Sequence, residues 1–203
     1  MYELANDPFY ETIRKYDRCV VGYCLMADGA PYRGLASHTD ALDFAMRREV
    51  EESIEDRRRA EVLFGKAFAD RLHPWVYDLE KAKAAPLDPA VFLYVPERLH
   101  RNKYSSSFYD YDTDWVFPND GGPIPYWFAF LEQPHGTGYE PADFRRVNAA
   151  LFPAGTDALE VYEWTTDWSD IFDAGHEWWG AACWSVYDAK LDRYAVLIVS
   201  ATD

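Results

Sequence analysis

The chain has 203 residues, and 20 lysines and arginines stand against 35 aspartates and glutamates, which gives a formal net charge of −15 at pH 7. About half of the residues are apolar (49%) and 17% are aromatic, so the composition is that of a folded globular protein and excludes an intrinsically disordered chain. Because carboxylates repel phosphate groups, the excess of acidic side chains predicts no nucleic-acid partner and no binding to an anionic membrane surface.

The N-terminal residues, 1–8, lack the basic and then apolar segments of a secretory signal, and no stretch reaches about 18 apolar residues, the length that spans a membrane. Three cysteines, Cys19, Cys24 and Cys183, are odd in number and lack the spacing of a zinc site. We therefore expect reduced thiols in the core of a cytoplasmic protein, with no metal and no cofactor.

The N-terminal part has mainly helical patterns. The elements expected there are a helix over 8–16, a strand over 19–27, a long helix from Thr39 or Asp40 to Leu72 and a short helix over 75–84. The long helix is predicted from apolar residues at spacings of four between Leu42 and Ile54, and its mostly charged segment, 47–61, is expected to face solvent. Two prolines, Pro86 and Pro89, then separate a helical half, about 1–86, from a sheet-rich half, about 87–203.

The C-terminal part has mainly strand patterns. The elements expected there are strands over 91–95 and 126–132, a helix opened by Pro141 and ended by Pro153, and strands over 159–166, 178–188 and 194–201. A short polar connector, 188–193, predicts a hairpin between the last two strands. We predict a single α+β domain over residues 1–203, in which an antiparallel sheet built mainly from the C-terminal part is packed by N-terminal helices.

Negative charge is concentrated in the sheet-rich half. Residues 1–86 have 13 basic and 16 acidic side chains, a net of −3, whereas residues 87–203 have 7 and 19, a net of −12. The window 104–189 alone holds 15 acids, only two arginines and seven of the eight tryptophans. Carboxylates and aromatic ring faces both attract cations, so this pattern is typical of a surface for a basic partner or of a sugar site. The alternative is that the tryptophans belong to the core and the acids serve solubility.

Two groups of carboxylates stand out within this window. Asp110, Asp112 and Asp114 alternate as at the start of a calcium loop, but a tryptophan and a glycine occupy the sixth and twelfth positions, where the loop needs a glycine and a carboxylate. In the second group, side chains at spacings of three follow a glutamate at the end of a predicted strand. Its members are Glu163, Asp167, Asp170, Asp173, His176 and Glu177. These are potential acids, bases or ligands, although such residues also cap turns.

The C-terminal stretch contains two distinctive segments, EVYEWTTDWSD (160–170) and HEWWGAACWSVYD (176–188). With them, residues 159–203 resemble a family of uncharacterised bacterial proteins that occur on mobile elements. The resemblance covers about a quarter of the chain, implies a bacterial cytoplasmic origin, and brings no activity or site residues with it.

Three functions are compatible with these patterns. The first is a non-enzymatic binding protein for a basic partner, such as an immunity-type inhibitor of a toxin or an antagonist of a nucleic-acid-binding defence enzyme. Its expected contact residues are Asp110, Asp112, Asp114, Glu163, Asp167, Trp168, Asp170 and Asp173. The second is a small-molecule or carbohydrate-processing enzyme that uses Glu163, Asp167, His176 and Glu177 beside tryptophans. The third is a structural or assembly subunit that associates through an apolar patch.

Overall fold

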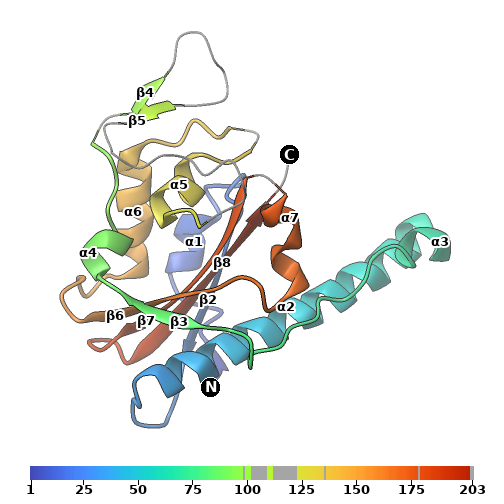
Figure 1. The fold of residues 1–203 in the computed structure, drawn as a ribbon, viewed down its shortest axis with the longest axis horizontal. Helices are drawn as coiled ribbons and strands as arrows, with labels where there is room; N and C mark the ends of the chain where they lie inside the picture. Colours follow the sequence, from blue (N-terminus) through green and yellow to red (C-terminus); the bar gives the residue numbers. More distant parts are fainter. Residues whose placement is uncertain (98, 102–108, 112–122, 135, 178, 202–203) are drawn as a thin grey trace.

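The computed structural model describes residues 1–97, 99–101, 109–111, 123–134, 136–177 and 179–201. Its centre is a six-stranded antiparallel sheet with the strand order β1-β2-β8-β7-β6-β3 (Figure 1). These strands are β1 (Tyr2–Glu3), β2 (Val21–Ala27), β3 (Ala84–Leu87), β6 (Leu159–Trp164), β7 (Gly180–Asp188) and β8 (Arg193–Ala201). A separate pair consists of β4 (Leu99–Arg101) and β5 (Tyr109–Tyr111). The α+β class and the mainly C-terminal origin of the sheet are confirmed.

Helices cover both faces of the sheet. The helices are α1 (Phe9–Ile13), α2 (Leu35–Phe64), α3 (Lys66–Ala69), α4 (Pro89–Phe92), α5 (Tyr126–Leu131), α6 (Pro141–Leu151) and α7 (Asp173–His176), with a 3₁₀ turn, η1 (Asp170–Phe172). The first half of α2 packs on one face, whereas α1, α5 and α6 cover the other (Figure 1). The hydrophobic core is therefore divided by the sheet into two layers.

The strands alternate their side chains between these two layers. On β7, Ala182, Trp184 and Val186 face α5 and α6, whereas Cys183 and Tyr187 face α2. The expected hairpin between β7 and β8 is present, with Asp188 opposite Arg193. Because β7 and β8 are covered on both faces, their sequences are apolar almost throughout, as expected of central strands.

Two predicted strands are not strands in the structure. Residues 126–132, expected as a strand, form α5, whose six side chains are all buried. A short segment that is apolar on every side has no visible period, so a buried helix and a buried strand look alike in sequence. Residues 91–95 overlap α4, which begins because the Asp88 carboxylate accepts the Ala90 N–H and Pro89 occupies the first helical position.

The segment before β3 is not the helix expected over 75–84. Tyr77 instead forms a bridge with Ser169, and the chain then enters β3, which pairs with β6. Pro86 is tolerated in β3 because this strand lies at the edge of the sheet, where one side needs no backbone partner. Since β2 and β3 belong to the same sheet as β8, the helical and sheet-rich halves share one sheet.

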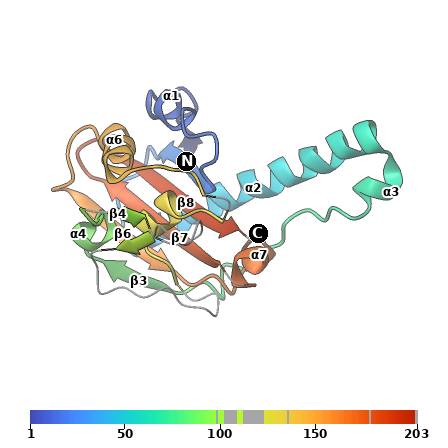
Figure 2. The ribbon, with the colours of Figure 1, turned by 90° about the horizontal axis from the view of Figure 1, so that it is seen from above.

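The long helix α2 begins and ends at glycines. It starts after Gly34, earlier than the expected caps, and stops at Gly65, whose φ of 86° favours a residue without a side chain. At 1.5 Å per residue its 30 residues span about 45 Å, so its second half extends past the sheet (Figures 1 and 2). We call residues 51–72 the arm. No helix in the described residues is long and apolar enough to cross a membrane.

Candidate functional site

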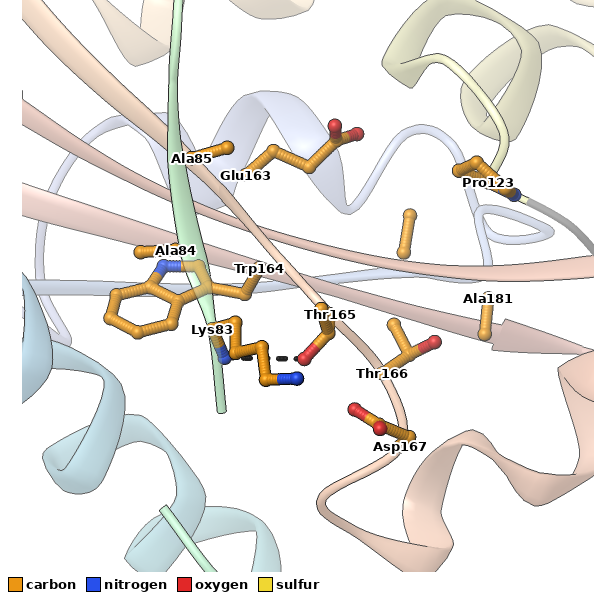
Figure 3. Close-up of a pocket in the computed structure, with 11 residues that line it drawn as sticks. Lys83, Ala84, Ala85, Pro123, Glu163, Trp164, Thr165, Thr166, Asp167 and Ala181 are labelled. Carbon is orange, nitrogen blue, oxygen red and sulfur yellow. Dashed lines mark hydrogen bonds between the residues drawn. The ribbon is translucent and has the colours of Figure 1, made fainter. Parts of the chain in front are cut away.

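A cavity of about 460 Å³ lies where β6 ends, against β3, β7 and Pro123 (Figure 3). Its walls include four alanines from the two neighbouring strands: Ala85 on β3 and Ala182 on β7 lie on the face of Glu163, whereas Ala84 on β3 and Ala181 on β7 lie on the α2 side. Such small side chains leave a hollow at this corner of the sheet, which larger core residues fill elsewhere. The volume is in the range of small-molecule sites.

The half-buried carboxylate in this cavity is that of Glu163. It lies on β6 between Ala85 and Trp184 in the sheet register, so all three side chains share one face. The Trp184 indole N–H donates to its Oε1 at 3.3 Å. Burial raises the pKa of Glu163, because removing water disfavours the charged form, and the indole hydrogen bond only partly opposes this. Within the described part of the chain, no ion pair reaches this carboxylate.

A second carboxylate, that of Asp167, lies at the exposed mouth of the cavity. Figure 3 shows it on the side of Lys83, away from the Glu163 carboxylate. A hydrogen bond from the Thr165 hydroxyl lowers the pKa of Asp167, with smaller contributions from its backbone and from the charges of Lys83 and His176. The backbone of Lys83 is fixed here, since its N–H donates to Thr165 Oγ1 and its carbonyl accepts the Thr165 N–H.

His176 lies beside the cavity wall on α7. Its Nε2 is 2.7 Å from the hydroxyl oxygen of Thr166, and Thr166 lines the cavity. The helix α7 is held against the sheet because Gly175 approaches Gly180 so closely that a Cβ at position 175 would lie 2.2 Å from the Gly180 carbonyl oxygen. Glu177 follows at the end of α7, exposed to solvent and not among the lining residues.

The remaining carboxylates of the predicted cluster do not converge on the cavity. The Asp170 carboxylate accepts the Val76 N–H at 2.7 Å, and the neighbouring Ser169 hydroxyl donates to the Val76 carbonyl. These two hydrogen bonds fix a turn, which was the alternative interpretation of the carboxylates at spacings of three. Asp173 is exposed in the first turn of α7.

Trp168 is a core residue and cannot anchor a partner on the surface, contrary to the expectation. It is 2% exposed and packs edge-on against Phe172, with ring centroids 5.1 Å apart. Four further tryptophans of the acidic window are also buried, namely Trp127, Trp164, Trp179 and Trp184. Large aromatic surfaces gain most from burial once the indole N–H has an acceptor, as with Trp179 and the Glu132 carbonyl.

The other predicted acidic group lies mostly outside the described residues. Asp112 and Asp114 fall outside them, as do Trp115 and Trp178. Asp110 belongs to β5, where it pairs with His100. Among the described residues, no group of three or more histidine, cysteine, aspartate or glutamate side chains is arranged to hold a metal ion.

Sequence reasoning missed a buried polar network on the opposite face of the sheet. His38 Nδ1 lies 2.8 Å from Ser185 Oγ, and His38 Nε2 lies 3.1 Å from the Tyr32 hydroxyl. The Trp164 indole N–H donates to Ser185 Oγ at 2.8 Å. At the other end of the network, burial and the nearby Glu160 carboxylate raise the pKa of Tyr32. Burial lowers the pKa of His38 to about 4, so the ring is neutral at pH 7. No local motif signals this network, because its serine and histidine are 147 residues apart.

Comparison of the chain with protein-family models, with curated proteins and with solved structures finds no match. The resemblance of residues 159–203 to a mobile-element family therefore stays a prediction, and the function has to be argued from the cavity itself.

Proposed function

We propose that this protein is a non-enzymatic binding protein whose cavity receives a basic side chain of a protein partner, with the Glu163 carboxylate as the group that recognises the charge. The observation that carries the proposal is the position of this carboxylate, half-buried among alanines with an uncharged indole as its hydrogen-bond donor. An immunity-type or anti-defence role is one form that such binding could take.

The energetic argument starts from the cost of the buried charge. A carboxylate in apolar surroundings is disfavoured unless a cation or several donors compensate for the lost water. A guanidinium or ammonium group placed beside Glu163 supplies that compensation, and its aliphatic stem can lie along the alanine walls. Asp167 at the mouth keeps its negative charge and adds attraction during approach.

The test uses n-butylguanidinium, which has the charge and stem of an arginine side chain. Backbone amide shifts of Ala182 and Thr166, both on the cavity wall, are followed by NMR during titration at low salt and at about 0.5 M salt, where screening is strong. We expect saturable shifts that weaken with salt, and a fall in the measured pKa of Glu163 on saturation. The absence of saturable shifts, or shifts confined to other parts of the sheet, would overturn the proposal.

Two variants make this test specific. Glu163→Gln keeps the size of the side chain and removes its charge, so the shifts at Ala182 and Thr166 should disappear. Glu61→Gln removes an equally negative side chain on the exposed arm and should leave them unchanged. Unaltered binding by Glu163→Gln would show that this carboxylate is not the recognition group.

A second candidate, a carbohydrate-processing enzyme, is favoured by one observation. Two carboxyl groups line the same cavity with opposite pKa shifts, raised for Glu163 and lowered for Asp167, which is the pattern of an acid and base pair. Glu163 would give its proton to the glycosidic oxygen as that bond to carbon breaks. Asp167 would take a proton from the attacking water as the new bond to carbon forms.

This candidate has its own test. Turnover of a panel of aryl glycosides by the unmodified protein, lost in both Glu163→Gln and Asp167→Asn, would favour the enzyme. Absence of turnover together with salt-sensitive guanidinium binding favours the binding protein.

A further inference from the structure

The outer end of the arm carries an unusual amount of exposed apolar surface. Val62, Leu63 and Phe64 form the last turn of α2 and are 85%, 71% and 67% exposed. Phe68 on α3 lies against Phe64, with ring centroids 5.0 Å apart, and is itself 42% exposed. Clustered apolar side chains at the end of a projecting element are typical of an interaction surface.

The same region is basic in an acidic protein. Residues 57–72, which we call the arm tip, contain five basic and two acidic side chains, a net of +3, so the other residues sum to −18. Four of the five basic side chains form ion pairs within the arm: Arg58 and Arg59 pair with Glu55 and Asp56, one turn earlier on α2, and Arg57 and Lys66 both pair with Asp70. These pairs are exposed to solvent, and such pairs contribute little to stability and exchange readily.

We propose that the arm tip of one molecule docks into the Glu163 cavity of a second copy of this chain. This inference rests on the proposed function, since it names the basic partner of that cavity. Charge complementarity carries it, because an apolar surface rimmed by arginines and a lysine matches an apolar hollow lined by two carboxylates and one lysine, Lys83. The arm extends away from its own sheet (Figures 1 and 2), which leaves the tip open to another molecule.

The chemistry of the contact follows from the two surfaces. An aromatic ring from Phe64 or Phe68 would fill the space between the alanines, and a neighbouring basic side chain such as Arg71 would reach Glu163. Because arm tip and cavity are different surfaces, the contact is head to tail, and it closes as a reciprocal dimer or continues as a larger assembly.

The experiment is sedimentation velocity of the full chain over a wide concentration range. The unmodified protein should associate reversibly as concentration rises, and less so in about 0.5 M salt. The arm variant Leu63→Glu/Phe64→Glu and the cavity variant Ala85→Arg should each stay monomeric. Both variants change exposed positions, so the fold should stay intact. The control is Val91→Glu, which changes an exposed apolar position elsewhere and should still associate.

Mixing the two monomeric variants gives the sharpest result. An equal mixture should form a dimer, because the cavity variant contributes an intact arm tip and the arm variant an intact cavity. Association that is lost in the arm variant but kept in the cavity variant would indicate contact between arms and overturn the head-to-tail arrangement. A chain that stays monomeric at every concentration overturns the inference outright, and so does arm-dependent binding to a different protein or to anionic vesicles without self-association.

The inference and the proposed function fail separately. Guanidinium binding at the cavity without self-association leaves the proposed function standing and removes only the second copy as partner. The arm variant should bind n-butylguanidinium as well as the unmodified protein does, since its cavity is unchanged.

Discussion

The imidazole Nδ1 of His38 and the hydroxyl oxygen of Ser185 lie 2.8 Å apart across the interface between α2 and the middle of the sheet. Both residues are fully buried. We assign the hydrogen bonds as a chain in one direction: the Trp164 indole donates to Ser185, Ser185 to His38 Nδ1, and His38 Nε2–H to Tyr32. In this order each of these three donors has an acceptor, so the first half of α2 is fixed to the sheet by polar as well as apolar contacts.

The pH dependence of folding should report on His38. Its pKa falls from 6.5 to about 4 on folding, so the unfolded chain binds a proton here that the folded chain does not. Above about pH 6.5 the ring is neutral in both states. As pH falls toward 4, protonation of the unfolded chain lowers the free energy of unfolding, by about 3 kcal/mol in all. Urea denaturation of the unmodified protein and of His38→Gln should show this slope only in the unmodified protein.

The control for that experiment is His73→Gln, since His73 is exposed. Its slope between pH 4 and 6.5 should match that of the unmodified protein. A rise in stability with pH over this range that survives in His38→Gln would assign the titration to another group.

Removal of the Ser185 hydroxyl should be costly. Ser185→Ala leaves the Trp164 indole N–H and His38 Nδ1 without partners in the core, and each buried unsatisfied group costs about 1–3 kcal/mol. We expect a large loss in the free energy of unfolding at pH 7. Thr156→Ala, which removes a hydroxyl at an exposed position before β6, should change it by less than about 0.5 kcal/mol. Similar effects of the two variants would contradict the assigned network.

Glu163→Gln should stabilise the protein at neutral pH. Because the folded-state pKa of Glu163 is raised, the folded chain holds this proton more tightly, and stability is lost as pH rises through the range between the unfolded and folded values. The neutral amide avoids that loss, so the free energy of unfolding should rise at pH 7 and change little at pH 4. Equilibrium denaturation at both pH values measures this, and equal changes at the two would contradict it.

Gly175→Ala should destabilise the attachment of α7. The new methyl group would lie 2.2 Å from the Gly180 carbonyl oxygen, and relief of such overlap requires backbone shifts that typically cost about 1–3 kcal/mol. Gly29→Ala is the matched control, because no atom lies within 4 Å of a Cβ at that position. Thermal unfolding should show a lower midpoint for Gly175→Ala alone, and equal midpoints would mean that α7 adapts freely.

Much of the fold could be predicted where an element has an amphipathic pattern, a clear end signal or, as in β8, a run of β-branched residues. The helix α6 and the strand β2 were expected within two residues of their bounds, because their sequences alternate between buried and exposed sides or contain a clear end signal. By contrast α5 is buried on all sides, and α4 depends on a cap at Asp88. Period alone cannot distinguish helix from strand in such segments.

The candidate site was only partly predictable for a related reason. Glu163 and Asp167 were expected to act together because they flank the end of one strand, and the cavity does contain both. Whether Trp168 lies on the surface or in the core depends on packing with residues distant in sequence, such as Leu42 and Met46 on α2, which local patterns do not encode. The cavity itself exists because β3 and β7, which flank β6 in the sheet, bring alanines to its end, and this order of strands is visible only in the folded chain.

The two edge strands of the six-stranded sheet limit how copies of this protein can associate. One edge, β1, is only two residues long, and the other, β3, contains Pro86, which has no N–H to offer a neighbour. Short edges and prolines deny an incoming strand the backbone ladder on which sheet extension and amyloid-type growth depend. The six-stranded sheet is thereby protected from extension by a second copy, and contacts between side-chain surfaces, which salt or dilution can reverse, are favoured over a continuous sheet that would be hard to separate.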